Sequence, residues 1–156
     1  MPIVNDSIDV AAYVTKECAQ KNFFVNLTKI QKLVFCVYGA VLATSGERIC
    51  KDHPIAWPHG PVFPRIYKYT KRHADGIVEA LMSHEENLTS ILNERQKKII
   101  DTTLNFFGRY NAGTLVLEKT AELPIYINNN VIYRNINTVN IKPGDVIEVF
   151  GLKIII

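Results

Sequence analysis

The strongest constraint on the fold is a nearly uninterrupted apolar run from Leu33 to Ala43. A run of about 10 to 14 apolar residues is typical of a core helix, whereas a membrane-spanning helix needs about 20. The run forms the second half of a predicted helix from Leu27 to about Thr44, which Asn26 can cap and Gly46 can stop. This half has no polar face, and such a helix is normally enclosed by other helices. We therefore expect a mainly helical, compact bundle around a buried central helix.

Composition and charge limit the class of protein. The 156 residues are 47% hydrophobic and 21% charged, which is typical of one ordinary globular domain and excludes wholesale disorder. The net charge of +3 is too small to indicate nucleic-acid binding by itself. Asp6 and Asp9 stand where a secretory signal would carry Lys or Arg, so we expect a cytoplasmic protein with no membrane segment.

Capping residues and apolar spacing predict four further helices. The first runs from Asp6 to about Gln20, and another follows Val62 and ends before Gly76. Asn93 and Gln96 resemble a capping box at the start of a helix that ends at Gly108. The last predicted helix starts at Asn111 and is terminated by Pro124.

The remaining segments lack a helical pattern. Pro54 to Pro64 holds four of the seven prolines, and proline fixes φ and removes a backbone donor, so we expect a rigid, ordered loop. Gly76 to Leu92 predicts a surface connection with one helical turn around Val78 to Met82. The tail from Tyr126 to Ile156 is rich in β-formers around a Pro143-Gly144-Asp145 turn signal, which predicts two strands.

Two segments carry motifs. The predicted central helix fits L-x-K-L-Q-K-L-L-Y-F-A-x-G followed by L-A-x-x-G, at Leu27, Lys29, Gln31, Lys32, Leu33, Phe35, Tyr38, Gly39, Leu42, Ala43 and Gly46. The segment from Ile55 to Tyr67 is similar to I-x-A-W-x-x-G-P-V-x-P-x-V-Y, with Trp57, Gly60, Pro61, Val62 and Pro64 in place. With weaker similarity at Leu115, Thr120 and Pro124, the chain resembles the Panacea family, the SocA-like antitoxin domain also described as phage-associated protein.

The resemblance implies one Panacea-like domain over residues 1–156, with its core at 7–125 and a C-terminal extension at 126–156. It implies an antitoxin that binds a cognate protein toxin encoded beside it and neutralises that toxin directly. A proteolytic adaptor that delivers a toxin to a protease, and a nucleic-acid-binding regulator, remain the alternatives. Family members commonly end in a short helix, so Asp145 to Phe150 has a helical alternative to the predicted strand.

The motif segments supply the candidate residues. The segment around Trp57 either plugs the bundle or forms a preorganised ledge for a partner, because rigid aromatic residues lose little entropy on binding. We assign partner binding to Trp57, His59, Pro61, Phe63, Arg65, Tyr67 and Lys68. We assign structural roles to Lys29, Gln31, Lys32, Leu33, Phe35, Tyr38, Gly39, Gly46, Gly60 and Pro64.

Other chemistry has weaker support. The basic residues Arg65, Lys68, Lys71, Arg72 and His73 lack a nucleic-acid-binding signature, so a solvated face is expected. Cys50, His53 and His59 are the one metal-like cluster, but a full zinc set is missing, and we expect no metal or cofactor. His59 is the one candidate general base, and without a recognised catalytic motif we expect no enzyme.

The odd number of cysteines, Cys18, Cys36 and Cys50, predicts reduced, buried thiols.

The tail is too apolar to remain in solvent. Its Ile and Val residues must pack on the bundle, pair with another copy of the chain, or await a partner. A homodimer is therefore one of three expectations for this segment.

Overall fold

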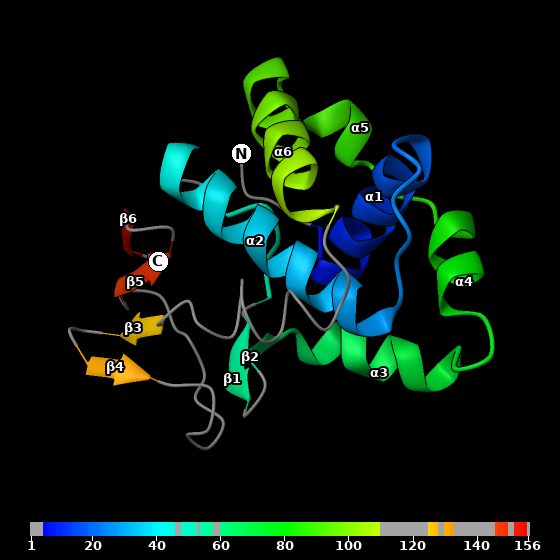
Figure 1. The fold of residues 1–156 in the computed structure, drawn as a ribbon, viewed down its shortest axis with the longest axis horizontal. Coiled ribbons are helices and arrows are strands. Elements are labelled where there is room, and N and C mark those ends of the chain that lie inside the picture. The colour runs from blue at the N-terminus through cyan, green and yellow to red at the C-terminus, as the bar shows by residue number, and fades with distance from the viewer. Residues whose placement is uncertain are drawn as a thin grey trace.

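A computed structural model of the chain describes residues 5–45, 48–52, 54–57, 60–109, 125–127, 130–132, 146–149 and 152–155. Over these ranges the fold is mainly helical, as the sequence predicts (Figure 1). The helices are α1 (Ser7–Gln20), α2 (Leu27–Ser45), α3 (Pro64–Arg72), α4 (Ile77–Ser83), α5 (Leu88–Ile91) and α6 (Glu94–Phe107). None of the helices described here combines the length and the apolar character needed to cross a membrane.

Helix α2 is the buried centre of the fold. In Figure 1 it runs through the middle of the molecule, with α6 above it and α3 below. It packs against α1, α6 and the strand that precedes α3. Side chains such as Ile30, Leu33, Phe35 and Val41 are at most 1% exposed. Because burial of one large apolar side chain contributes about 1.5–3 kcal/mol, these side chains of α2 stabilise the described part of the core by several kcal/mol. The predicted central helix is confirmed.

Capping residues set the helix starts that the sequence predicted. The Asp6 carboxylate accepts hydrogen bonds from the backbone N–H groups of Ile8 and Asp9, and Asp9 reciprocates at the Asp6 N–H. Asn93 and Gln96 form the same reciprocal box at the start of α6. Each box satisfies backbone donors that a helix start leaves unpaired.

The segment that was predicted as a rigid, ordered loop contains a β-hairpin, which the sequence analysis did not predict. Strands β1 (Ile55–Trp57) and β2 (Gly60–Val62) are antiparallel, and Ile55 pairs with Val62. Pro61 lies within β2 although it has no N–H to donate. A two-stranded sheet tolerates this because each of its strands is an edge strand.

Residues 76–92 contain two short helices, where we predicted a connection with one helical turn. Helix α4 is longer than that turn, and α5 was not predicted. Leu81 of α4 and Leu88 of α5 are at most 1% exposed within the core. Tertiary burial therefore stabilises helices that are too short to be stable in isolation.

The tail contains strands, as its composition predicts. Strands β3 (Ile125–Ile127) and β4 (Asn130–Ile132) form one antiparallel hairpin, and β5 (Val146–Val149) and β6 (Leu152–Ile155) form another. Four strands are thus described where two were predicted, and residues 146–149 adopt the strand alternative. Strand β6 contacts α2, so this part of the tail packs on the bundle. The predicted helix from Asn111 and the turn at residues 143–145 lie outside the described residues.

Candidate partner-binding surface

The two motif segments meet through one side chain. The Gln31 amide on α2 accepts a hydrogen bond from the Phe63 N–H at 2.9 Å and donates one to the Phe63 carbonyl at 3.1 Å. Gln31 is 5% exposed and Phe63 is fully buried, so both bonds lie inside the core. A side-chain amide can satisfy both backbone groups because it carries a donor and an acceptor. Gln31 therefore fixes the point at which β2 ends and α3 begins.

Phe63 is a core residue, which corrects its assignment to the partner-binding surface. Its ring packs edge to face on Tyr38 of α2, with ring centroids 5.6 Å apart. This geometry is favourable for aromatic pairs, and a side chain so enclosed cannot reach a partner in this arrangement. The single residue Phe63 thus joins the hairpin to α2 through both its backbone and its ring.

Helix α3 starts from this fixed point and presents a charged outer face. Pro64 occupies the first turn, where its missing N–H removes no helical bond. Ile66 and Thr70 are buried and anchor the helix to the core. The exposed residues on the other side are Arg65, Tyr67, Lys68, Lys71 and Arg72. Three of the seven predicted partner-binding residues, Arg65, Tyr67 and Lys68, therefore lie together at the surface.

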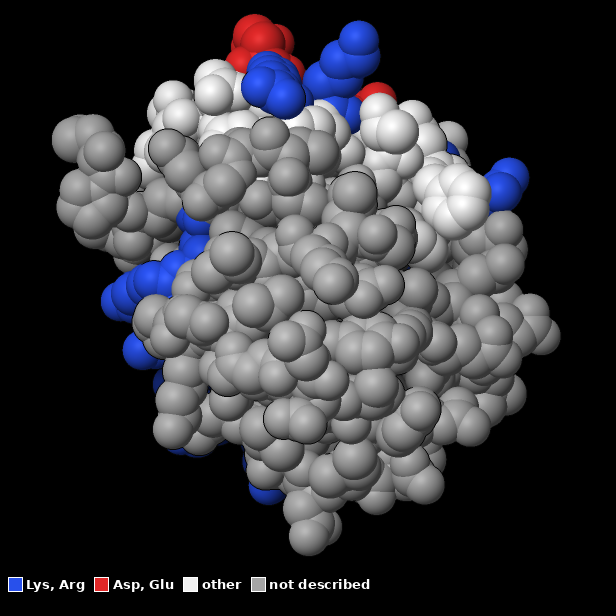
Figure 2. Space-filling model, turned by 90° about the vertical axis from the view of Figure 1, so that its left-hand side faces the viewer, with Lys and Arg blue, Asp and Glu red and all other residues white. Residues whose placement is uncertain are grey.

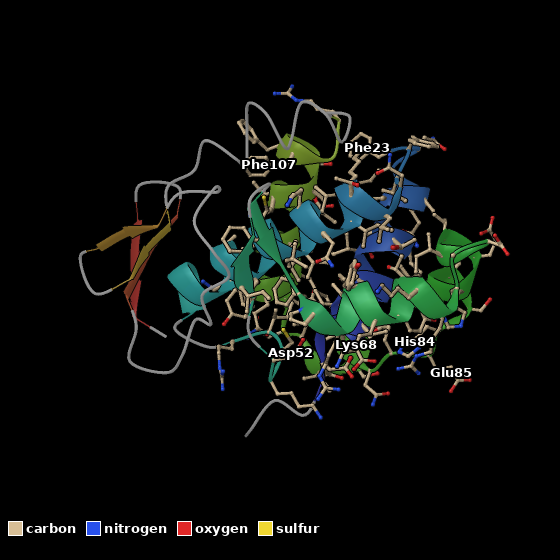
Figure 3. The ribbon with its side chains drawn as sticks, turned by 90° about the horizontal axis from the view of Figure 1, so that it is seen from below. Phe23, Asp52, Lys68, His84, Glu85 and Phe107 are labelled. Atoms are coloured by element: carbon tan, nitrogen blue, oxygen red, sulfur yellow. The ribbon has the colours of Figure 1, made fainter. Side chains whose placement is uncertain are left out.

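The charges on α3 are only partly compensated. Arg65 lies 3.7 Å from the Asp6 carboxylate, and the Lys71 ammonium sits 4.8 Å from the centre of the Tyr67 ring. Lys68 and Arg72 have no ion-pair partner among the described residues. In Figure 3, Lys68 lies on the side of the molecule that carries Asp52 and His84, away from Phe23 and Phe107.

A further part of the surface is seen in Figure 2. Among the described residues in this view, Lys and Arg are visible at the left edge, and residues of both charges are visible at the top.

The hairpin tip holds Trp57, His59 and Pro61, three of the predicted partner-binding residues. The backbone of Trp57 pairs with that of Gly60, which places Gly60 at the start of β2. The side chains of Trp57 and Pro61, and the whole of His59, lie outside the described part of the chain. The choice between packing and partner contact for Trp57 therefore stays a prediction.

Two motif lysines are buried within α2. Lys29 is 3% exposed, and its ammonium donates to the carbonyls of Phe24 and Gly108. Burial lowers the pKa of Lys29, while Cys18 acts in the opposite direction. Burial likewise lowers the pKa of Lys32 to about 8, against the effect of Cys36. Lys29 ties the start of α2 to the end of α6.

The burial of four other motif residues on α2 is also described. Leu33, Phe35 and Tyr38 are at most 1% exposed, and Gly39 is buried. Gly46 lies outside the residues that the structure describes.

The three thiols are buried. Burial raises the pKa of Cys18 to about 11 and that of Cys36 to about 12. The pKa of Cys50 is also well above its usual value, first because of burial and then because of Asp52. Among the described residues no three His, Cys, Asp or Glu side chains gather as a metal site requires. His53, the second residue of the metal-like cluster, lies outside them.

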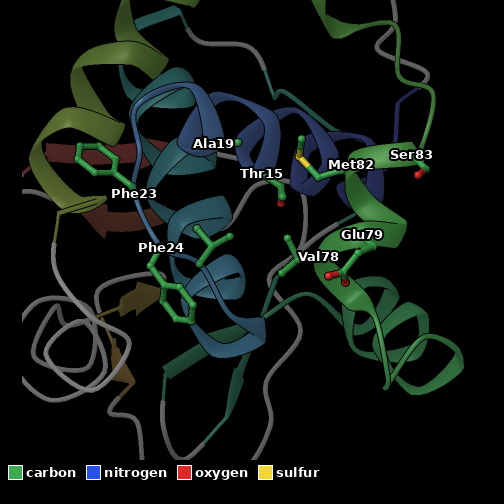
Figure 4. A pocket seen from close by; sticks show the side chains of 9 residues that line it. Thr15, Ala19, Phe23, Phe24, Val78, Glu79, Met82 and Ser83 are labelled. Carbon is green, nitrogen blue, oxygen red and sulfur yellow. The ribbon is translucent and has the colours of Figure 1, made fainter.

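A groove that the sequence analysis did not identify lies between α1, the connection from α1 to α2, and α4 (Figure 4). Its volume is about 670 Å³. Phe24 and Met82 line it, with 78% and 41% of their surfaces exposed. The one sequence signal was the pair of adjacent phenylalanines at 23 and 24, between two predicted helices.

Comparison with known proteins gives one match. The model of the family described as "Antitoxin SocA-like, Panacea domain" matches residues 30–122, more than half of the chain. The match includes Gln31 and Phe63, the two residues that join the motif segments. No curated protein and no solved structure matches the chain.

Proposed function

The chain belongs to the SocA-like antitoxin family with a Panacea domain, and from that premise we propose that it neutralises a cognate protein toxin by binding it directly. The mechanism is occlusion, in which the antitoxin covers a surface that the toxin needs for its activity. The antitoxin contributes no catalysis of its own.

The observation that carries this proposal is the way in which α3 is held. Gln31 and Tyr38 fix Phe63 immediately before α3, while Ile66 and Thr70 anchor its inner face. A surface that is already ordered loses little conformational entropy when a partner binds. The motif segments therefore support a rigid platform.

The charge on this platform favours an acidic partner surface. Lys68 and Arg72 are exposed and, among the described residues, without carboxylate partners, and Lys71 and Arg65 extend the same face. Charge complementarity at an interface accelerates association and suppresses wrong partners. We infer that the toxin places Asp and Glu side chains against α3.

Coexpression tests the proposal. Each gene product encoded beside this protein is expressed alone and together with it, and growth rescue and copurification at a fixed ratio are scored. The expected result is one neighbour that is toxic alone, tolerated with this protein and recovered as a complex. A screen without any toxic neighbour or any complex would contradict a neighbour-encoded pair.

Charge-reversal variants then locate the binding surface. Lys68→Glu combined with Arg72→Glu should weaken the complex by about tenfold or more at low salt, because the charge complementarity is reversed. Arg95→Glu combined with Lys98→Glu changes the net charge equally on exposed residues of α6 and should leave binding near wild type. Equal losses in both variants would argue against an interface on α3.

A further inference from the structure

The groove between α1 and α4 has a shape that matches the surface of a helix. Thr15 and Ala19 form its floor, and they are one helical turn apart on α1 (Figure 4). Val78 and Met82 repeat the same spacing along the α4 wall, opposite Phe23–Val25. Rows of residues four apart are the ridges and grooves through which helices pack on one another. The volume of about 670 Å³ lies within the range of roughly 300–1,000 Å³ that binding clefts occupy.

Phe24 is held in its exposed position by hydrogen bonds on both sides. The Phe23 N–H donates to the Cys18 carbonyl at 2.9 Å, and the buried Lys29 ammonium donates to the Phe24 carbonyl. Asn22 adopts a left-handed conformation with φ of 58°, which turns the chain at the end of α1. A large aromatic side chain that is 78% exposed on a fixed backbone is a preorganised anchor for a partner.

The opposite wall is adaptable. Leu81 faces the core and is fully buried, whereas Met82, its neighbour on α4, lines the groove and is 41% exposed. Methionine is unbranched and polarisable, and it is frequent on surfaces that accommodate more than one apolar partner. One rigid aromatic wall and one adaptable wall suit the apolar stripe of an incoming helix.

The charge of the groove lining indicates which charge its binding partner should carry. Glu79 is the one charged side chain among the described lining residues, and it has no ion-pair partner among them. An apolar occupant with a cation next to its stripe would place that cation against Glu79. We propose that this groove binds an amphipathic helix of a partner protein, with apolar side chains between Phe24 and Met82 and a Lys or Arg paired with Glu79.

This proposal goes beyond toxin neutralisation and does not depend on it. The groove is lined by α1, α4 and the segment between α1 and α2, whereas the proposed toxin surface is the cationic face of α3. The two surfaces also require opposite charge in their partners. An experiment that refutes one proposal therefore does not refute the other.

Fluorescence anisotropy with three labelled synthetic peptides tests the groove on the full chain. The first is an amphipathic helix with a leucine stripe and one lysine at the border of the stripe, and the second has glutamate in place of that lysine. The third has the composition of the first without a stripe. We expect the lysine peptide to bind about tenfold more tightly than the glutamate peptide and the scrambled peptide not to bind. Glu79→Lys should reverse the order of the first two.

Matched variants test whether the lysine peptide binds in this groove. Phe24→Ser and Met82→Ser should each weaken the lysine peptide by about tenfold, because each removes one apolar wall. Phe106→Ser removes an aromatic side chain that is 51% exposed on α6 and should have no effect. The proposal is overturned if no peptide binds, if the scrambled peptide binds equally well, or if Phe24→Ser has no effect. It is also overturned if Phe24→Ser converts a dimer to a monomer in sedimentation, because the occupant would then be a second copy.

Discussion

Substitution of Gln31 tests the central junction of the fold. Gln31→Leu keeps a side chain of similar size but leaves the N–H of Phe63 without a partner inside the core, while the Phe63 carbonyl keeps its hydrogen bond from the Tyr67 N–H. A buried polar group left unsatisfied costs about 1–3 kcal/mol, so the unpaired N–H predicts a loss of about 1–3 kcal/mol. Since the free energy of unfolding of a domain is about 5–15 kcal/mol, this loss should be large enough to measure.

Urea unfolding followed by circular dichroism measures the loss. With a slope near 2 kcal/mol per M, the expected change lowers the midpoint by about 0.5–1.5 M. Gln20→Leu is the matched control, because Gln20 is exposed at the end of α1 and its substitution should change stability by less than about 0.5 kcal/mol. Equal midpoints for the two variants would refute the role of Gln31.

A second variant at the same position adds a dependence on pH. Gln31→Glu in its protonated form can still accept from the Phe63 N–H and donate to the carbonyl, whereas the carboxylate cannot donate. Burial beside a carbonyl should raise the pKa of this carboxyl above its unfolded value of about 4.3. The stability of Gln31→Glu should therefore approach that of wild type below about pH 4 and fall as the pH rises through the folded pKa. A difference from wild type that does not change with pH would contradict this reasoning.

Three further substitutions test packing, capping and a buried charge. A Cβ atom at Gly108 would lie 2.5 Å from a backbone carbonyl oxygen, so Gly108→Ala should lower the free energy of unfolding by about 1–3 kcal/mol. Gly76→Ala is the control. The nearest contact of its Cβ atom would be at 3.4 Å, so this substitution should lower the free energy of unfolding by less than about 1 kcal/mol. Asn93→Ala removes the capping bond of α6 and should cost about 1 kcal/mol in the same urea assay. The lowered pKa of Lys32 means that the unfolded chain binds more protons between about pH 8 and 10.5, so wild type should gain stability relative to Lys32→Met as the pH rises through this interval. An unchanged difference between pH 7 and pH 10 would contradict the burial of that ammonium.

Local signals in the sequence were sufficient for four helices. Helices α1 and α6 have capping boxes, α2 has a long apolar run, and α3 has an amphipathic pattern after a proline. Each of these signals acts within a few residues along the chain. The boundaries of α1, α2 and α6 were therefore predictable to within one or two residues, whereas α3 ends at Arg72, three residues short of its predicted end before Gly76.

The remaining features depend on contacts between distant residues. The burial of Phe63 follows from Gln31, which is 32 residues earlier in the chain, and no local pattern indicates that pairing. Helices α4 and α5 depend on the burial of Leu81 and Leu88 against other helices. The groove exists because Lys29 and the Asn22 turn fix a loop against α1, which a search for catalytic or metal motifs does not detect.

Titration of the purified toxin with this protein tests the proposed direct neutralisation most directly. The toxin is recovered from the coexpression screen, and its activity is measured as increasing amounts of the antitoxin are added, without any third protein. The proposal predicts that activity falls linearly and is abolished at a fixed molar ratio, because one antitoxin occludes each toxin surface. Full toxin activity at excess antitoxin, with loss only after a protease and ATP are added, would contradict direct neutralisation and indicate a proteolytic adaptor.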